Sequence, residues 1–400
     1  MNLIKAAIYF LLFATIAYSG WWIYTYTFDT EAPVITLEGL DEGSTHKDML
    51  KATLNGSDRY RIRAITVTVD DEPIVDNKII NRSSVRLPLT FDTHAMAQGK
   101  HTLKVEAQDG SYAQNKMAFT RTFFVDNLPL HFSLMRPTGD VRIFQGKTIH
   151  VQFQLNKSEV KAHATLFGQT YPCFPVTKSS LVWECFVPVP CEQDPGEYVL
   201  ELVVEDGVGG SHKEEIPLQI VAFPFKTSSL TVSQEKMDKE LEMSRSQQEL
   251  DDRFAALFKE SPQEKLWHGV FYAPIEIKRK TTDYGTIRTT QLRGRYMHKA
   301  VDVINLPKSV VWAPQDGIIV MKDRFAYSGN TIIIDHGFGI FTLLYHLDNF
   351  ANVNVGDKVK RGSPVGTLGM TGYASGYHLH WEMRINNVHV DPEQWIDSAF

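Results

Sequence analysis

The sequence predicts a mainly β protein with one N-terminal transmembrane helix and a second helical segment. Three observations lead to this prediction: an uncharged apolar run near the N-terminus, short alternating segments separated by turn residues from Pro33 onward, and a glycine-rich β pattern after Trp267. A chain of 400 residues is too long for one hydrophobic core, so we expect several domains. The net charge of -6 does not indicate nucleic-acid binding.

The N-terminal run contains 23 residues without a charge between Lys5 and Asp29. This length is enough to cross a bilayer as a helix, and Trp and Tyr residues gather at its far end, as at a membrane interface. Since the basic residue precedes the run, we expect a single-pass cytoplasmic (inner) membrane protein with residues 1–30 as the anchor. The rest of the chain then lies outside the cytoplasm, in the periplasm or on the cell-wall side. A cleaved signal peptide, with "AYS" at 17–19 as its cleavage site, is the alternative.

The next two hundred residues contain an internal repeat. "GKHTLKVEAQDG" begins at Gly99 and "GEYVLELVVEDG" begins at Gly196. Short alternating strands in two copies predict two immunoglobulin-like β-sandwich domains, at 31–127 and 128–224. We find no catalytic or carboxylate constellation in them, so they are expected to form a stalk or a contact surface. If the compartment is oxidising, Cys173 and Cys185 are the better candidates for a disulfide, and three free cysteines are the alternative.

Residues 225–262 change in character and are expected to form a helical linker. Glu, Lys, Gln and Leu dominate, and apolar residues recur at helical spacing, which predicts a helix at 233–258 that ends before Pro262. This helix is expected to pack on the following domain. The alternative is a segment that covers a substrate groove or binds a partner protein.

The C-terminal segment, residues 263–400, contains a candidate metal site. In "GYHLHWEMRI", His378 and His380 are two positions apart, so in a strand both side chains lie on one face. This pair alone is equally consistent with chance. "YMHKAVDV" adds His298 and Asp302, and two imidazoles with one carboxylate are a typical catalytic zinc set that leaves a fourth position for water. His378 and His346 then remain near that water for proton transfer and charge stabilisation.

These motifs resemble the lysostaphin-type, or LytM, zinc metallopeptidases, which cut peptide bonds in bacterial peptidoglycan. The resemblance covers about 130 residues and includes "WAPQDGIIV" at 312–320 and "NTIIIDHGFGIFTLLYHL" at 330–347. It implies a β-rich peptidase domain at 263–400 and a Zn²⁺ cofactor. In order and spacing, the matching residues imply metal binding by His298, Asp302 and His380. His378 then corresponds to the general base, and His346 to a residue that orients water or stabilises the oxyanion. Ala300 stands where the family often has glycine.

The resemblance gives the expected function: a membrane-anchored zinc metalloendopeptidase of cell-wall remodelling. Peptidoglycan peptides are then its substrate, and a protein partner could bind the immunoglobulin-like domains or the helix at 233–258. The alternative is a LytM-type binding module that has lost catalysis and activates other cell-wall hydrolases. Glu382, on the same strand face as the histidine pair, is expected either to orient a ligand histidine or to form a surface salt bridge.

Overall fold

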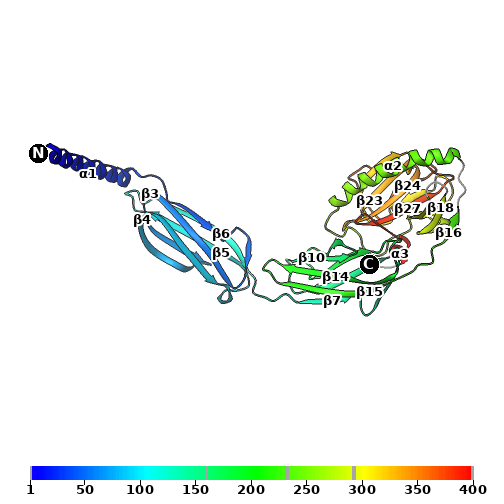
Figure 1. Cartoon of the computed structure of the whole chain (residues 1–400), viewed down its shortest axis with the longest axis horizontal. Helices are drawn as coiled ribbons and strands as arrows, with labels where there is room; N and C mark the ends of the chain where they lie inside the picture. Colours follow the sequence, from blue (N-terminus) through cyan, green and yellow to red (C-terminus); the bar gives the residue numbers. More distant parts are fainter. Residues whose placement is uncertain (1, 159, 230–233, 291–293, 398–400) are drawn as a thin grey trace. The chain divides into compact units, whose positions relative to one another are not determined.

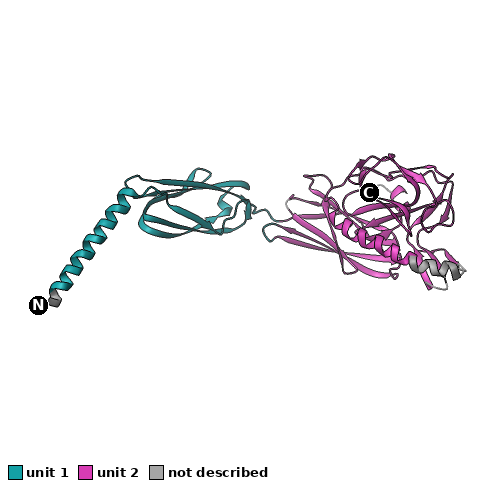
Figure 2. Cartoon of the chain, turned by 90° about the horizontal axis from the view of Figure 1, so that it is seen from above, with its two compact units in different colours: residues 1–129, 207–209 teal, residues 130–206, 210–400 magenta. Residues whose placement is uncertain are grey.

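The structure is a computed structural model that describes residues 2–158, 160–229, 234–290 and 294–397. It is mainly β, as predicted, with an apolar helix at the N-terminus (Figure 1). The chain divides into two compact units: unit 1 comprises residues 1–129 and 207–209, and unit 2 comprises residues 130–206 and 210–400 (Figure 2).

The N-terminal helix, α1, spans Asn2–Phe28. Its segment Lys5–Phe28 is long and apolar enough to cross a membrane. A signal sequence passes the same test of length and composition, so the helix fits both of the readings that the sequence offers.

The β domain of unit 1 is built around a long hairpin of two 21-residue strands. Within the described residues its elements are β1 (Val34–Glu38), β2 (Ser44–His46), β3 (Met49–Val69), β4 (Glu72–Asp92), η1 (Thr93–Ala95), β5 (Gly99–Asp109) and β6 (Lys116–Val125). The first half of β3 pairs with β1, and its second half pairs with β5. A register shift between Ser57 and Ile62 separates the two halves, so within one six-stranded sheet β3 changes its partner on one side from β1 to β5 while β4 pairs with it on the other. Leu54, Ile65 and Val105 lie in the buried core of this domain.

In unit 2, the strands between Phe132 and Val221 form two sheets with one hydrophobic core between them. The first sheet contains β11 (Gln169–Pro172), β10 (Val160–Leu166), β14 (Gly196–Asp206), β15 (Ser211–Val221) and β8 (Val141–Phe144). The second contains β12 (Phe174–Pro175), β13 (Val182–Pro188), β9 (Thr148–Leu155) and β7 (Phe132–Arg136). Val151 and Leu202 are representative of the buried residues that the two sheets contribute. Cys173, Cys185 and Cys191 are buried and have free thiols.

The C-terminal segment is organised around one large, mostly antiparallel sheet. Its path is β17 (Arg279–Thr282), β20 (Val301–Ile304), β27 (Leu379–Ile385), β24 (Ile340–Phe350), β23 (Gly329–Asp335), β22 (Gly317–Phe325) and β25 (Lys358–Val359). Three short strands and a helix attach to this path: β21 (Val310–Trp312), β26 (Pro364–Leu368), β28 (Val388–Val390) and α3 (Glu393–Asp397). A smaller sheet consists of β16 (Thr227–Ser229), β18 (Thr286–Thr290) and β19 (Gly294–His298). Both faces of the central strands are buried: β24 is apolar along most of its buried length, and β27 alternates apolar residues with His380, Glu382 and Arg384.

Helix α2 (Gln234–Leu257) corresponds to the helix predicted at 233–258, and a 3-10 turn, η2 (Phe258–Glu260), continues it to the region of Pro262. Leu250 and Phe254 are fully buried against residues of the large sheet, among them Phe341 and Leu343. The helix is therefore part of the C-terminal fold, because its apolar stripe completes the core on one face of the sheet.

Strand β13 packs directly on the C-terminal segment inside unit 2. Phe186 contacts the rings of Trp267 and Trp395 at centroid distances of 5.6 and 5.4 Å. Beside this aromatic cluster, the buried carboxylate of Glu184 accepts hydrogen bonds from Lys265 Nζ at 2.9 Å and pairs with His150 Nε2 at 2.9 Å. Removing Lys265 would leave the Glu184 carboxylate buried with less compensation, and the loss of one partner of a buried charge is strongly destabilising.

A buried carboxylate on β23 predicts a pH-dependent stability. Burial raises the pKa of Asp335 to about 6, although Gly337 N and Ser261 Oγ donate to its Oδ1. Between pH of about 4 and 6 the folded chain holds a proton that the unfolded chain has released, so stability falls as pH rises through this window. Asp335→Asn keeps an acceptor for both donors. We expect it to be more stable than the wild type at pH 7.5, by about 1–3 kcal/mol, and similar to it at pH 4.

Urea unfolding of unit 2 at the two pH values measures this difference. If Asp335→Asn changed the free energy of unfolding equally at pH 4 and pH 7.5, the pH dependence of stability would not come from this carboxyl group.

Candidate metal centre

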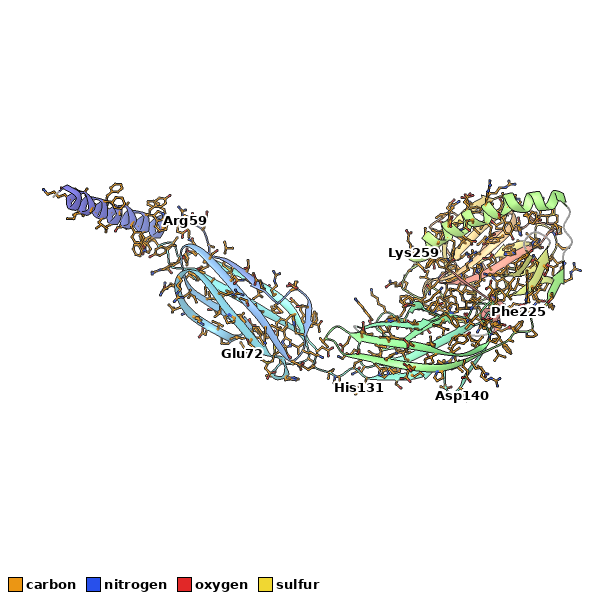
Figure 3. The ribbon with its side chains drawn as sticks, viewed as in Figure 1. Arg59, Glu72, His131, Asp140, Phe225 and Lys259 are labelled. Carbon is orange, nitrogen blue, oxygen red and sulfur yellow. The ribbon has the colours of Figure 1, made fainter. Side chains whose placement is uncertain are left out.

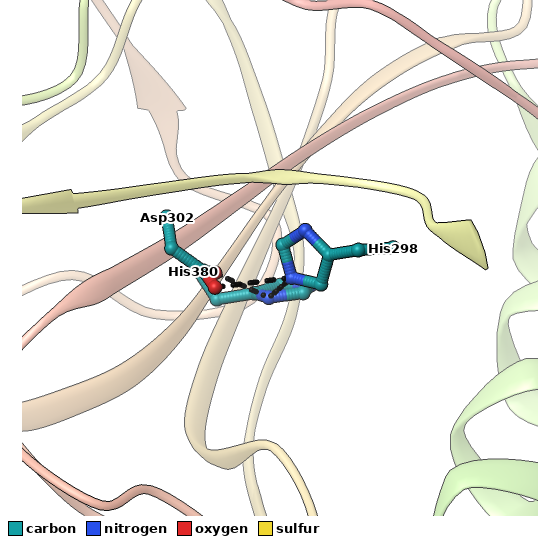
Figure 4. Close-up of side chains that lie close together, drawn as sticks. All are labelled: His298, Asp302 and His380. Carbon is teal, nitrogen blue, oxygen red and sulfur yellow. Dashed lines mark hydrogen bonds and ion pairs between the residues drawn. The ribbon is translucent and has the colours of Figure 1, made fainter. Parts of the chain in front are cut away.

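Three side chains from separate strands converge in the C-terminal segment (Figure 4). His298 Nε2 lies 3.2 Å from Asp302 Oδ2 and 3.2 Å from His380 Nδ1, and His380 Nδ1 lies 3.0 Å from Asp302 Oδ1. All three residues are buried. The sequence predicted that these residues form one group, and the structure places them together.

Strand register explains why the three side chains meet. Asp302 on β20 and His380 on β27 are directly opposite each other in an antiparallel pair, so their side chains share one face of the sheet. His298 ends β19, and the chain turns through Lys299 and Ala300 into β20. With this four-residue spacing, His298 ends a strand of the small sheet and still lies next to Asp302 and His380 on the large sheet.

The hydrogen bonds of His380 test whether these residues suit a metal ion. Glu382 Oε1 lies 3.0 Å from His380 Nε2, so the ring gives its Nε2 proton to Glu382 and its Nδ1 lone pair faces Asp302. A lone pair and a carboxylate oxygen at 3.0 Å need a cation or a proton between them. Burial alone would lower the pKa of His380, but the hydrogen bonds to Asp302 and Glu382 raise it to about 9. The site therefore favours positive charge. A divalent metal ion fits this donor set of two imidazole nitrogens and one carboxylate.

His378 and His346 lie beside this group, and neither belongs to it. Their ring centroids are 4.7 Å apart, and His378 Nε2 is 4.0 Å from Asp302 Oδ1. His378 Nδ1 donates to Gly376 O at 2.9 Å, and His346 Nδ1 donates to Thr371 O at 2.8 Å. Because a carbonyl can only accept, each neutral ring carries its proton on Nδ1, and each Nε2 is left as an acceptor. β27 begins at Leu379, so His378 precedes the strand in which the sequence pattern placed it.

His346 is held in an unusual backbone conformation. Its φ is +62°, in the left-handed region that costs free energy for a residue other than glycine, and its amide donates to Ser328 O at 2.8 Å. Burial and the neighbouring charges of His378 and His380 lower the pKa of His346 to about 3. The ring is therefore neutral at physiological pH.

The family comparison agrees with this arrangement. The model of "Peptidase family M23" matches residues 296–392, a range that includes all five of these residues. Residues 296–392 form a peptidase family M23 domain. The sequence resemblance to LytM-type peptidases is thereby confirmed.

Two curated relatives each match 30% of this chain. "Peptidoglycan DD-endopeptidase ShyC" of Vibrio cholerae is 30% identical over 121 residues, which cover 30% of this chain and 28% of that protein. "DD-carboxypeptidase/endopeptidase Mpg" of Neisseria meningitidis is 33% identical over 119 residues, covering 30% and 27%. The solved catalytic domain of lysostaphin from Staphylococcus simulans is 32% identical, covers 30% of this chain and 92% of that chain, and has a TM-score of 0.27. The aligned part of this chain thus spans less than a third of these two curated relatives.

Two arginines at the M23 site were not recognised from the sequence. Arg288 on β18 donates to Asp302 Oδ2 at 3.2 Å, so it neutralises part of the charge of that carboxylate. Arg384 on β27 is buried and donates from Nε to Glu382 Oε2 at 3.0 Å. Glu382 is thus held between His380 and Arg384 and does not form a surface salt bridge. The geometry favours the other expectation, that Glu382 orients His380.

Helix α2 reaches this network through Arg384. Asp251 Oδ1 lies 2.9 Å from Arg384 Nη2, and the ring of Phe254 lies 4.8 Å from the guanidinium carbon. Asp251, Arg384, Glu382 and His380 therefore form a continuous chain of charged contacts from the helix to the candidate metal centre. Tyr345 adds support from β24, because its ring stacks on His380 at a centroid distance of 5.0 Å.

This chain of contacts predicts that Asp251→Asn weakens metal binding. Loss of the carboxylate charge loosens Arg384 and, through Glu382, the orientation of His380. Asp251 is 37% exposed, so water screens part of the effect, and we expect an affinity for zinc about 2–10-fold lower. Competition with a chelator of known affinity measures it.

Asp252→Asn is the matched control for this prediction. Both aspartates accept a hydrogen bond from the glutamine four residues earlier, Gln247 for Asp251 and Gln248 for Asp252, but Asp252 is exposed. Equal zinc affinities in the two variants would show that Asp251 on α2 does not support the metal centre.

His336 is a structural residue. Its Nδ1 lies 2.8 Å from Asp316 O and its Nε2 lies 2.9 Å from Thr342 Oγ1, so both ring nitrogens have partners away from the site. Burial lowers its pKa to about 4. It connects β22, β23 and β24 as a neutral ring.

Proposed function

We propose that this chain is a membrane-anchored zinc metalloendopeptidase that hydrolyses peptide bonds of bacterial peptidoglycan. The observation that carries the proposal is the convergence of His298, Asp302 and His380 next to two histidines whose Nδ1 atoms donate to backbone carbonyls, which leaves each neutral ring with Nε2 as an acceptor. The names of the relatives, two of them peptidoglycan or DD-endopeptidases, support the substrate class. The retention of all five side chains argues against a module that only activates other hydrolases.

His298, Asp302 and His380 would hold the zinc ion. Zinc in such a site lowers the pKa of a water molecule and polarises the carbonyl of the bond to be cut. Asp302 is the anionic member: although burial opposes it, hydrogen bonds to His298 and His380 keep its pKa well below the usual range. Glu382 keeps the Nδ1 lone pair of His380 directed at the site.

His378 is the proposed general base. Its Nε2 accepts a proton from water, and the resulting imidazolium can donate that proton to the leaving amine. The bond from Nδ1 to Gly376 O fixes the ring in this orientation before and after the transfer.

His346 is assigned to the orientation of water. A neutral ring with its proton on Nδ1 offers Nε2 as an acceptor, and this suits a hydrogen bond from water better than stabilisation of an oxyanion, which needs a donor. The strained backbone of His346 is consistent with a position fixed by function.

The proposal also covers domain organisation and location. We assign 1–30 to a membrane anchor, 31–127 and 128–224 to immunoglobulin-like sandwiches, 225–262 to a helical linker and 263–400 to the peptidase domain. The peptidase domain then faces the periplasm or cell wall, where its substrate is. A protein partner is proposed to bind the immunoglobulin-like domains or the helix at 233–258.

Digestion of purified sacculi tests the function. The full chain in detergent is incubated with sacculi, with chelator, and with chelator followed by zinc, and the released fragments are identified by mass spectrometry. We expect muropeptides with a cut peptide bond, loss of cleavage with chelator and recovery with zinc. Absence of cleavage by the zinc-loaded chain alone would contradict an enzyme and favour an activating module.

A further inference from the structure

A second cluster of acidic side chains lies in unit 1, where α1 joins the β domain. A carboxylate oxygen from each of Asp29, Asp58 and Asp109 lies within 4.8 Å of the other two. Asp29 directly follows α1, Asp58 lies in β3, and Asp109 is the last residue of β5. Three segments that are distant in sequence therefore bring negative charge to one point.

One carboxylate oxygen of Asp29 is buried without a partner. Asp29 is 1% exposed, and its Oδ2 has no hydrogen-bond partner in the described part of the chain. Its Oδ1 accepts a long bond from Glu31 N at 3.4 Å. A buried carboxylate oxygen that lacks a partner is costly, so this position favours a positively charged ligand.

Positive side chains nearby do not balance the cluster. Arg59 (labelled in Figure 3) lies over the ring of Tyr24 at 5.5 Å, and Arg61 lies over the ring of Tyr60 at 4.9 Å. Within the described ranges, Asp29, Asp58 and Asp109 form no ion pair with Lys, Arg or His. Burial and the charges of Asp29 and Asp109 raise the pKa of Asp58. Like charges at this separation repel unless a cation or a proton neutralises them.

The carboxylates are held in place by neighbouring groups. Ser111 Oγ and Asn115 Nδ2 donate to Asp109 at 2.9 and 2.8 Å, and Tyr60 N donates to Asp58 at 2.9 Å. Asn115 also donates to the backbone oxygen of Asp29 at 3.1 Å, which joins two of the segments. The oxygens are therefore oriented before any ligand binds.

We propose that Asp29, Asp58 and Asp109 form a Ca²⁺ site that fastens the end of α1 to the β domain. The donors are all oxygens, which suits a hard cation and not zinc. Calcium binds oxygens at about 2.3–2.6 Å, so ligands on opposite sides of the ion are up to about 5 Å apart, consistent with the spread of this cluster. Several converging carboxylates favour Ca²⁺ over Mg²⁺, which usually keeps most of its water.

Calcium binding to the full chain in detergent tests the site. Equilibrium dialysis with ⁴⁵Ca²⁺ measures stoichiometry, and hydrogen exchange with mass spectrometry measures protection with 5 mM Ca²⁺ or 5 mM Mg²⁺. We expect one Ca²⁺ per chain, with a dissociation constant on the order of 0.1–1 mM, as in other extracellular modules. Ca²⁺ should slow exchange several-fold around residues 29–33, 57–62 and 108–115.

Asp58→Asn is the test variant, because an amide oxygen can still accept from Tyr60 N. It should lose the bound Ca²⁺ and the Ca²⁺-dependent protection, and without Ca²⁺ it should exchange no faster than the wild type, since a repulsive charge is gone. Asp76→Asn, an exposed aspartate in the same β domain, should bind Ca²⁺ as the wild type does. If Asp58→Asn does not fold, Asp29→Asn replaces it.

Three results would overturn the proposal. The first is a failure of the binding test: either the wild type binds no Ca²⁺ at 5 mM, or Asp58→Asn binds as much Ca²⁺ as the wild type. The second is equal protection by Mg²⁺ and Ca²⁺, which would reject calcium as the ligand. The third is protection that appears on acidification and does not respond to Ca²⁺, which would mean that a proton neutralises the cluster.

Discussion

Asp302→Ala is expected to remove zinc and peptidoglycan cleavage together. Asp302 is the anionic member of the group, and its two oxygens lie 3.0 Å from His380 Nδ1 and 3.2 Å from His298 Nε2. Without it, two neutral imidazoles remain, and Arg288 loses the carboxylate to which it donates. An uncompensated guanidinium then repels a divalent cation. Zinc content should fall from about one to below about 0.1 per chain, and cleavage should fall about a thousand-fold or more, in keeping with the several kcal/mol that a catalytic metal supplies.

Metal analysis and muropeptide release measured on the same preparation check this prediction. Asp348→Ala is a suitable control, because the side chain of Asp348 bonds to that of its neighbour Asn349. The control should keep both zinc and activity. Full cleavage by Asp302→Ala, or zinc retained at one per chain, would show that the metal is bound elsewhere.

The C-terminal site was predictable because its residues lie in short, locally spaced motifs. His378 and His380 are two residues apart, and His298 and Asp302 are four apart, so each pair is visible in the sequence. The direct opposition of Asp302 and His380 was not visible, because it depends on the register of β20 against β27. The resemblance to a known family supplied that long-range information.

Residues that act across the fold left no such signal. Arg288 is one of several basic residues in its segment, and its bond to Asp302 depends on how β18 pairs with β19. Asp251 belongs to a charged helix face, where an acidic residue usually faces solvent. Asp29, Asp58 and Asp109 are far apart in the sequence and have no common spacing. For this reason the sequence shows no carboxylate constellation in the first β domain, although the structure brings these three together.

The alternating pattern predicted where strands occur, but it did not predict how long they are. Asp70 and Asp71 mark the turn between β3 and β4, where both residues have a positive φ. The alternating pattern gave the strands on each side of the turn but not the 21-residue length of β3 and β4. A strand that changes its neighbour from β1 to β5 keeps its alternation in each half, so the pattern does not show the change of partner.

His378→Ala is expected to keep zinc and lose turnover. His378 lies outside the group of three, with its Nε2 at 4.0 Å from Asp302 Oδ1, and its Nδ1 is engaged by the backbone. Removal of a general base that is not a ligand should lower kcat about 10²–10⁴-fold, with little change in zinc affinity. His268→Ala, an exposed histidine of the same segment, is the control and should keep both.

The His378→Ala variant separates metal binding from proton transfer more clearly than any change at His346 can. His346 is buried with φ of +62°, so alanine there would alter the backbone of β24 as well as the ring, and a loss of activity would have two explanations. His378 is partly exposed and precedes β27, so its ring can be removed with less disturbance. If His378→Ala loses zinc in proportion to activity, His378 is a ligand, and the base must be sought at His346. If zinc and activity both persist, the proton is transferred by another group, and the proposed mechanism is wrong even where the metal centre is right.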